Sequence, residues 1–222
     1  MVVGSTLYFV ADTAFGFSCM IKEKFPAWNS FSNNLGTLFS ALPISPNVYS
    51  WLTVPAALFG LICIILGCVG WGVLGFVLAG ILDVIDGAVA RKKEITSHYG
   101  AFLDGSLDRL VDFFVIFSYY WLPLSTPWLP IGPWIAIAYF FAIMPSFEVA
   151  YANHRFAVID PDEKIIWRIL NRGEMYPIMV LIPLIAIFNP TIASVIFMIL
   201  VFLSFVTTLQ TFIHTLHLAS DS

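Results

Sequence analysis

Four aspartates lie close together in the sequence, next to long apolar segments: Asp83, Asp86, Asp104 and Asp108. The first two are three positions apart and the last two are four apart, so each pair would lie on one face of a helix. Four carboxylates gathered in apolar surroundings would repel one another and lose much of their hydration. A divalent cation offsets both effects, and a site of carboxylate oxygens alone favours Mg²⁺ or Mn²⁺ over zinc. The spacing therefore predicts a magnesium or manganese site.

Small residues share the faces of these aspartates. Gly87 and Ala90 lie on the face of the first pair, and Gly100 lies one turn before Asp104. Such residues commonly allow close helix packing in membranes, but their position beside the acids favours a pocket that admits a ligand. Arg91 follows at the predicted end of the first helix, where it could neutralise a phosphate. The excess of basic residues in cytoplasmic loops would also place it there.

The helices that carry these residues are predicted to span a membrane. Of the 222 residues, 59% are hydrophobic and 11% are charged, and the mean hydropathy is +0.90, which excludes a soluble domain with a polar surface. About 20 mostly apolar residues cross a bilayer as a helix. Six segments are candidates: 48–68, 70–90, 100–121, 131–152, 174–189 and 191–215. The predicted fold class is therefore an all-α integral membrane protein with six transmembrane helices.

Three parts are expected along the chain. Residues 45–217 would form the six-helix membrane domain, preceded by an N-terminal segment over 1–44 and followed by a tail over 218–222. Within the N-terminal segment, apolar side chains of residues 28–42 recur on one helical face. This pattern predicts an amphipathic helix beside the membrane, lying along its interface. An ordinary connecting helix is the alternative.

Basic residues predict the orientation in the membrane, because cytoplasmic loops collect Lys and Arg. They occur before the first span, between the second and third, and between the fourth and fifth: Lys22, Lys24, Arg91, Lys92, Lys93, Arg155, Lys164, Arg168 and Arg172. The opposite loops have none. We expect a multi-pass protein with both termini and the polar active site on the cytoplasmic side. The net charge of −4 gives no indication of a nucleic-acid partner.

At this point the pattern resembles that of a known family. The motif is similar to the signature of the CDP-alcohol phosphotransferases at every position: Asp83-x2-Asp86-Gly87-x2-Ala90-Arg91-x8-Gly100-x3-Asp104-x3-Asp108. Upstream, the segment SPNVYS resembles the Pro-Asn-x-x-Thr element that opens the family's first helix, with Ser50 at the Thr position. The resemblance covers roughly residues 45 to 215 and includes the six-helix layout.

The resemblance implies that a CDP-linked alcohol gives its phosphate-bearing half to an acceptor hydroxyl and releases CMP. Asp83, Asp86 and Asp104 would hold two Mg²⁺ or Mn²⁺ ions at the diphosphate. Asp108 would be the general base that accepts the proton of the acceptor hydroxyl, and it would also contact a metal ion. A homodimer is expected from the same resemblance.

The resemblance also implies a nucleotide site and a donor. The residues expected to line the nucleotide site are Gly87, Ala90, Arg91, Gly100, Asn47 and Ser50. Small six-helix members resemble the enzymes that use CDP-lipids, so we expect CDP-diacylglycerol or CDP-dialkylglycerol to enter from the membrane lipids. A soluble CDP-alcohol such as CDP-choline is the alternative donor.

The acceptor is expected to be a small alcohol. Arg155, Arg168 and Arg172 could bind a phosphate on it, although ordinary cytoplasmic-loop charge explains them equally well. Members that use inositol phosphate usually have arginines after a Ser-Tyr pair in the fourth helix, where this chain has Val149 and Tyr151. Serine, inositol, inositol phosphate, glycerol phosphate and other polyols all remain candidates.

Two other classes of protein would also place carboxylates in a membrane. A cation transporter would use them as a transport site, but acids near one surface and the lack of a repeated half suit an active site better. A membrane prenyltransferase would use Asp-rich clusters and Mg²⁺ to hold a diphosphate.

Asp112 lies one turn beyond Asp108 on the same helical face, and Arg109 is close enough to pair with it or with a neighbouring helix. Both residues are interpreted as structural.

Overall fold

A computed structural model describes residues 34, 37–40, 42–93, 97–157 and 169–220. Its regular structure over these residues is helical, without strands: α3 (Pro46–Ile65), α4 (Val69–Lys92), α5 (His98–Ser118), the 3-10 turn η1 (Tyr119–Trp121), α6 (Ile131–His154), α7 (Arg172–Phe188) and α8 (Pro190–Ser220). Each of the six predicted spans overlaps one of the helices α3 to α8. Most of the predicted interfacial helix over 28–42 lies outside the described residues.

Four of these helices, among the residues described, are long and apolar enough to cross a membrane: α3, α4, α6 and α8, with mean hydropathies of 2.0, 2.1, 1.6 and 2.6 over their most apolar windows. The charged residues of the site lower the hydropathy of α5, and α7 is only 17 residues long. The prediction of a helical membrane protein is therefore confirmed, with four rather than six helices meeting the criteria of a span.

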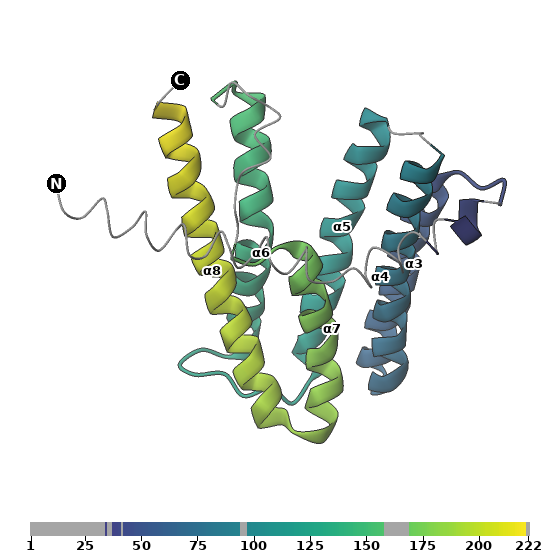
Figure 1. Ribbon diagram of the computed structural model, residues 1–222. Helices are drawn as coiled ribbons and strands as arrows, with labels where there is room; N and C mark the ends of the chain where they lie inside the picture. Colours follow the sequence, from purple (N-terminus) through teal and green to yellow (C-terminus); the bar gives the residue numbers. More distant parts are fainter. Residues whose placement is uncertain (1–33, 35–36, 41, 94–96, 158–168, 221–222) are drawn as a thin grey trace.

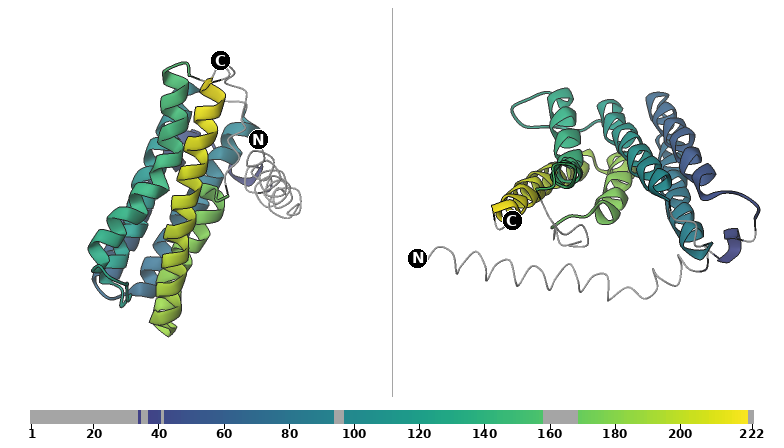
Figure 2. Two further views of the ribbon diagram at one scale, coloured as in Figure 1. Left: turned by 90° about the vertical axis from the view of Figure 1, so that its left-hand side faces the viewer. Right: turned by 90° about the horizontal axis from the view of Figure 1, so that it is seen from above.

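The helices form two groups with α7 between them (Figures 1 and 2). Helices α3, α4 and α5 pack together, α6 packs on α8, and α7 contacts α4, α5 and α8. The core between them is apolar and centres on large buried side chains such as Phe76, Met179 and Phe197. The Tyr119 hydroxyl donates to the carbonyl of Met179 at 2.8 Å, which links the end of α5 to α7.

Glycines bring α3 and α4 into backbone contact. A Cβ atom on Gly60 would lie 2.8 Å from the carbonyl oxygen of Gly72, and one on Gly75 would lie 2.8 Å from the Cα atom of Gly60. Only hydrogen atoms fit at these positions, which is the small-residue packing common in membranes. The contact joins the later part of α3 to the first turns of α4, so the two helices run antiparallel and the start of α3 lies on the same side as the end of α4.

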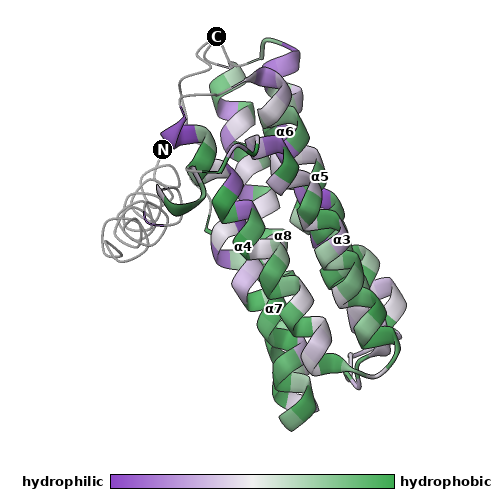
Figure 3. Cartoon of the chain, turned by 90° about the vertical axis from the view of Figure 1, so that its right-hand side faces the viewer, coloured by the Kyte–Doolittle hydropathy of each residue, from purple (hydrophilic) through white to green (hydrophobic). Residues whose placement is uncertain are grey.

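Polar and apolar residues are separated along the bundle. Hydrophilic residues gather toward the end at which the chain terminates, and the opposite half is almost uniformly apolar (Figure 3). The outward faces carry many exposed apolar side chains, including Leu78, Phe202 and Phe212. An apolar exterior of this kind suits contact with lipid.

Candidate active site

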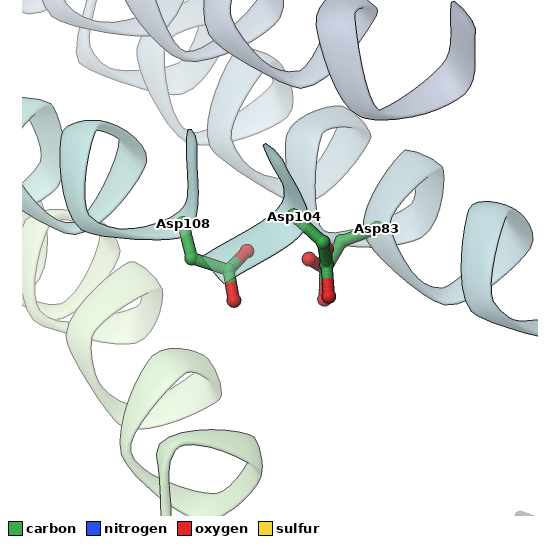
Figure 4. A group of neighbouring side chains, drawn as sticks. All are labelled: Asp83, Asp104 and Asp108. Atoms are coloured by element: carbon green, nitrogen blue, oxygen red, sulfur yellow. The ribbon is translucent and has the colours of Figure 1, made fainter. Parts of the chain in front are cut away.

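Three aspartates from two helices converge at the polar end. Asp83 comes from α4, and Asp104 and Asp108 come from α5 (Figure 4). One carboxylate oxygen of each lies within 4.8 Å of those of the other two. The side chains of Asp83 and Asp108 are 30% and 15% exposed. The structure therefore brings together three of the four aspartates that the spacing predicted to meet.

Asp86 lies at the edge of this cluster and is more deeply buried, with 5% of its surface exposed. The Ser50 hydroxyl from α3 hydrogen-bonds to its carboxylate, and the charges of Asp83 and Asp104 are near enough to repel it. Within the part of the chain that the structure describes, its Oδ2 atom has no hydrogen-bond partner. A buried anionic oxygen of this kind is costly unless a cation or donor approaches it.

These observations test whether a divalent metal fits here. Every candidate donor is a carboxylate oxygen, which is the ligand type that Mg²⁺ and Mn²⁺ prefer. The three clustered carboxylates lie close enough to share one ion. The charges of Asp83 and Asp104 act on the buried Asp86 carboxylate, whose Oδ2 atom has no hydrogen-bond partner among the described residues. The residues therefore fit a hard divalent cation.

Arg172 supplies a positive charge to the same cluster from the first turn of α7. Its Nη1 atom lies 2.7 Å from Oδ2 of Asp108 and 3.4 Å from the carboxylate of Asp83. Its Nε atom lies 3.2 Å from Oδ2 of Asp112. From the sequence we expected Arg172 to lie in a loop and to bind the acceptor, whereas in the structure it lies among the carboxylates.

The position of Arg172 is fixed by how α7 docks on α4. Its guanidinium carbon lies 5.6 Å from the centre of the Tyr176 ring, one turn further along α7. The Tyr176 hydroxyl donates to the carbonyl of Phe76 at 2.7 Å. The ring also covers Gly80, where a Cβ atom would lie 2.7 Å from the ring carbon Cε1. Gly80 precedes Asp83 by three residues, so this contact sets the register between the arginine and the cluster.

Asp112 joins two arginines at the base of the cluster. Its side chain is 1% exposed and contacts Nε of Arg172 and, at 3.6 Å, Nη1 of Arg109. Arg109 in turn donates to the Ser146 hydroxyl of α6 at 2.8 Å. The predicted pairing of Arg109 with Asp112 is present, but the contact of Asp112 with Arg172 was missed. Its signal in the sequence was a carboxylate one turn beyond Asp108 on the same face.

The residues predicted for the nucleotide site lie at the junction of α3, α4 and α5. A Cβ atom on Gly100 would lie 3.4 Å from Oδ1 of Asn47, so the start of α5 faces the start of α3. A Cβ atom on Gly87 would lie 3.3 Å from Nη1 of Arg91, whose guanidinium lies across that glycine. Ala90 follows Gly87 by three residues on α4. Both glycines thus leave room beside polar side chains.

The structure describes two of the three arginines predicted for the acceptor, Arg155 and Arg172. Arg155 follows α6, is exposed, and lies over the ring of Tyr151 at 5.7 Å. Arg168 lies outside the described residues. Of the two that are described, Arg172 contacts the carboxylates of Asp83, Asp108 and Asp112. It also lines a small cavity together with Arg109, Ser146 and Thr207.

Comparison with known proteins decides the family. The family model of CDP-alcohol phosphatidyltransferase matches residues 44–210. The chain belongs to this family. The predicted resemblance is therefore confirmed, and the match includes all of the aspartate motif and the start of α3.

Curated relatives match shorter segments. The phosphatidylinositol phosphate synthase of Cutibacterium acnes is 32% identical over 94 residues, which cover 42% of this chain and 45% of that protein. The bifunctional IPC transferase and DIPP synthase of Aquifex aeolicus is 39% identical over 83 residues, which cover 35% of this chain and 19% of that protein. The chain thus spans less than half the length of these two relatives.

Solved structures share the fold over most of the chain. Phosphatidylinositol phosphate synthase of Mycobacterium tuberculosis with CDP-DAG bound aligns with a TM-score of 0.64 and 20% identity, covering 85% of this chain and 92% of that one. The same enzyme in complex with manganese and citrate aligns with a TM-score of 0.65 and 20% identity, covering 85% and 88%. The chain therefore shares the helical fold of this synthase.

Proposed function

We propose that this protein transfers a phosphatidyl-type group from a CDP-lipid to the hydroxyl of a small polar alcohol and releases CMP, with a divalent metal ion required. The observation that carries the proposal is the convergence of Asp83, Asp104 and Asp108 within 4.8 Å. Family membership supports the reaction class, and the fold shared with an enzyme solved with CDP-DAG supports a lipid-linked donor.

The metal site would consist of carboxylates from α4 and α5. Asp83, Asp86 and Asp104 would bind two Mg²⁺ or Mn²⁺ ions, with Asp108 as a further ligand. When bound, the ions would neutralise the diphosphate and stabilise the charge that develops on departing CMP. The manganese complex of the structurally similar synthase supports a divalent ion in this fold.

Asp108 would be the general base. Its carboxylate lies in the cluster and is 15% exposed, so it can meet a substrate hydroxyl. It would accept the proton of the acceptor hydroxyl while that oxygen bonds to the lipid-bearing phosphorus. The bond from this phosphorus to the oxygen shared with CMP then breaks, and the oxygen leaves with CMP.

The cytidine diphosphate would lie at the junction of α3, α4 and α5. Gly87 and Gly100 have no side chains there, which lets a phosphate approach the backbone, and Ala90 continues the same small-residue face. Arg91 would neutralise phosphate charge. Asn47 and Ser50 of α3 would complete the site, where Asn47 faces Gly100 and Ser50 contacts Asp86.

The lipid part of the donor would remain in the bilayer. The outward faces of the helices are apolar over the half of the bundle away from the site (Figure 3). A donor such as CDP-diacylglycerol or CDP-dialkylglycerol would keep its chains against this surface while its nucleotide reaches the cluster. In this arrangement α5 and α7 cross the membrane with the other four helices, and both termini and the site face the cytoplasm.

The acceptor would enter the cavity beside Arg172. Arg109 and Ser146 line it and would contact its polar groups, and Arg155 and Arg168 would approach from the adjoining loop. Several relatives are synthases of inositol phosphate lipids, including the archaetidylinositol phosphate synthase of Methanothermobacter thermautotrophicus. We therefore propose inositol phosphate as the first acceptor to test. We also propose that the chain acts as a homodimer.

The test is CMP release by the purified protein with Mn²⁺ and CDP-diacylglycerol. Separate reactions would contain inositol phosphate, inositol, glycerol phosphate or serine, and a parallel set would replace the lipid donor by CDP-choline. The proposal expects one acceptor to give CMP with the lipid donor only. CMP release with CDP-choline alone would contradict the lipid donor, and no release in any reaction would contradict the proposed activity.

A further inference from the structure

Arg172 and the proposed metal ion depend on the same carboxylates. The Nη1 atom of Arg172 lies 2.7 Å from Asp108 and 3.4 Å from both oxygens of Asp83. These are two of the three residues whose oxygens lie within 4.8 Å of one another. A guanidinium that donates to a carboxylate uses the lone pairs that a metal would use. Its charge also repels a cation a few ångströms away.

From this overlap we propose that Arg172 competes with the divalent cation for Asp83 and Asp108. The inference rests on the proposed metal site. Cation binding then requires the Nη1 atom of Arg172 to move away from both carboxylates, and the arginine lowers the affinity of the site for the metal alone. The Oδ2 atom of the buried Asp86 side chain has no hydrogen-bond partner among the described residues. It would be a further oxygen ligand for the metal, and Arg172 does not contact it.

The side chain of Arg172 is held in place by neighbouring side chains. Its Nε atom contacts Asp112, which is 1% exposed, and its guanidinium lies against the Tyr176 ring. The Tyr176 ring is itself fixed by its hydrogen bond to the carbonyl of Phe76 and by its contact with Gly80. Fixed neighbours reduce the entropy lost when the arginine bridges the carboxylates. A flexible lysine would compete less effectively.

A neighbouring cavity gives the displaced group a place to go. Arg172 lines this cavity together with Arg109, Ser146, Met175 and Thr207. We therefore expect Nη1 to move into this cavity while the contact of Nε with Asp112 at 3.2 Å is kept. The exchange thus moves one positive charge from the carboxylates to the cavity proposed for the acceptor.

The test is the affinity of the purified full-length protein for Mn²⁺ alone, measured from the paramagnetic resonance signal of free Mn²⁺. Arg172→Gln is expected to lower the Kd for Mn²⁺ at least tenfold relative to wild type. The Kd of Arg172→Lys is expected to lie between those of wild type and Arg172→Gln. The matched control is Lys92→Gln, which removes an exposed positive charge at the end of α4. Its effect is expected to stay below about twofold, since solvent and salt screen exposed charges.

A gain of affinity cannot arise from misfolding, but Arg172→Gln leaves the buried Asp112 with Arg109 alone at 3.6 Å. The double variant Arg172→Gln with Asp112→Asn is therefore compared with Asp112→Asn. We expect Arg172→Gln to tighten Mn²⁺ binding both in the wild-type protein and in the Asp112→Asn variant. Unchanged or weaker binding in both overturns the proposal. Asp83→Asn tests the metal site separately from the competition by Arg172. If this variant binds Mn²⁺ with the affinity of wild type, the metal site itself is refuted.

Discussion

At the scale of single residues, the site depends on charges that compensate one another in a poorly hydrated place. Asp112 shows this most clearly, because its carboxylate is 1% exposed and has arginine nitrogens at 3.2 Å and 3.6 Å. Removing one partner of a buried ion pair leaves the other charge without compensation, which is more costly than the pair is favourable. We therefore interpret Asp112 as the residue that fixes Arg109 and Arg172 relative to each other.

Asp112→Ala is expected to lower the free energy of unfolding by about 1–3 kcal/mol. The loss is limited because Arg172 keeps its contacts with Asp83 and Asp108. Thermal unfolding in detergent measures the effect. Ser106→Ala on the same helix removes only an exposed hydroxyl bonded to its own helix and should leave the Tm unchanged. Equal Tm values for the two variants would contradict this role of Asp112.

The aspartates were predictable because helical periodicity relates residues three and four apart without any knowledge of the fold. Arg172 was not predictable as their partner, because it is separated from Asp83 by 89 positions and reaches it only when α7 docks on α4. The sequence gives no local indication of that docking. Gly80 is the residue on α4 that permits this docking, but its contact with Tyr176 is known only from the structure.

At the scale of elements, the docking of α7 on α4 positions the arginine against the carboxylates. The contact surface is Gly80 on α4 and the Tyr176 ring on α7. Composition predicted both helices within a few residues of their observed ends, since apolar length decides where a span can lie. It could not predict the contact between them, because the two helices are far apart in the sequence.

Gly80→Ala is expected to weaken this docking. The added Cβ atom would lie 2.7 Å from Cε1 of Tyr176, so α7 must shift and carry Arg172 with it. Overpacking of this kind typically costs about 1–3 kcal/mol, and we expect a lower Tm together with slower CMP release. Gly105→Ala is the control, since nothing lies within 4 Å of its Cβ position. If Gly80→Ala matches the Tm of Gly105→Ala, the contact does not constrain α7.

At the scale of the whole molecule, polarity is divided along the bundle. The carboxylates, the basic residues after α4 and the end of α8 lie toward one end, and the turn between α3 and α4 lies at the other. Lys and Arg favour the cytoplasmic side. We propose that this division orients the molecule with the site facing the cytoplasm, where a soluble acceptor would be available.

This orientation predicts which cysteines a membrane-impermeant maleimide can reach in intact cells. Cys68, exposed in the turn between α3 and α4, should be labelled from outside in a variant with Cys19→Ser and Cys63→Ser. A cysteine introduced by Ser220→Cys at the end of α8, with Cys68→Ser, should be labelled only after the membrane is permeabilised. The reverse pattern would invert the proposed topology.

The central claim is that the carboxylates of α4 and α5 form a metal-dependent active site for group transfer from a CDP-lipid. The most direct measurement follows CMP and the product lipid together, with Mn²⁺ present or chelated, for wild type, Asp108→Asn and Ser106→Ala. The account predicts equal amounts of CMP and product for wild type and Ser106→Ala only with Mn²⁺, and turnover at least about 100-fold lower for Asp108→Asn. Turnover of Asp108→Asn equal to wild type, or Mn²⁺ flux across a membrane without CMP release, would contradict it.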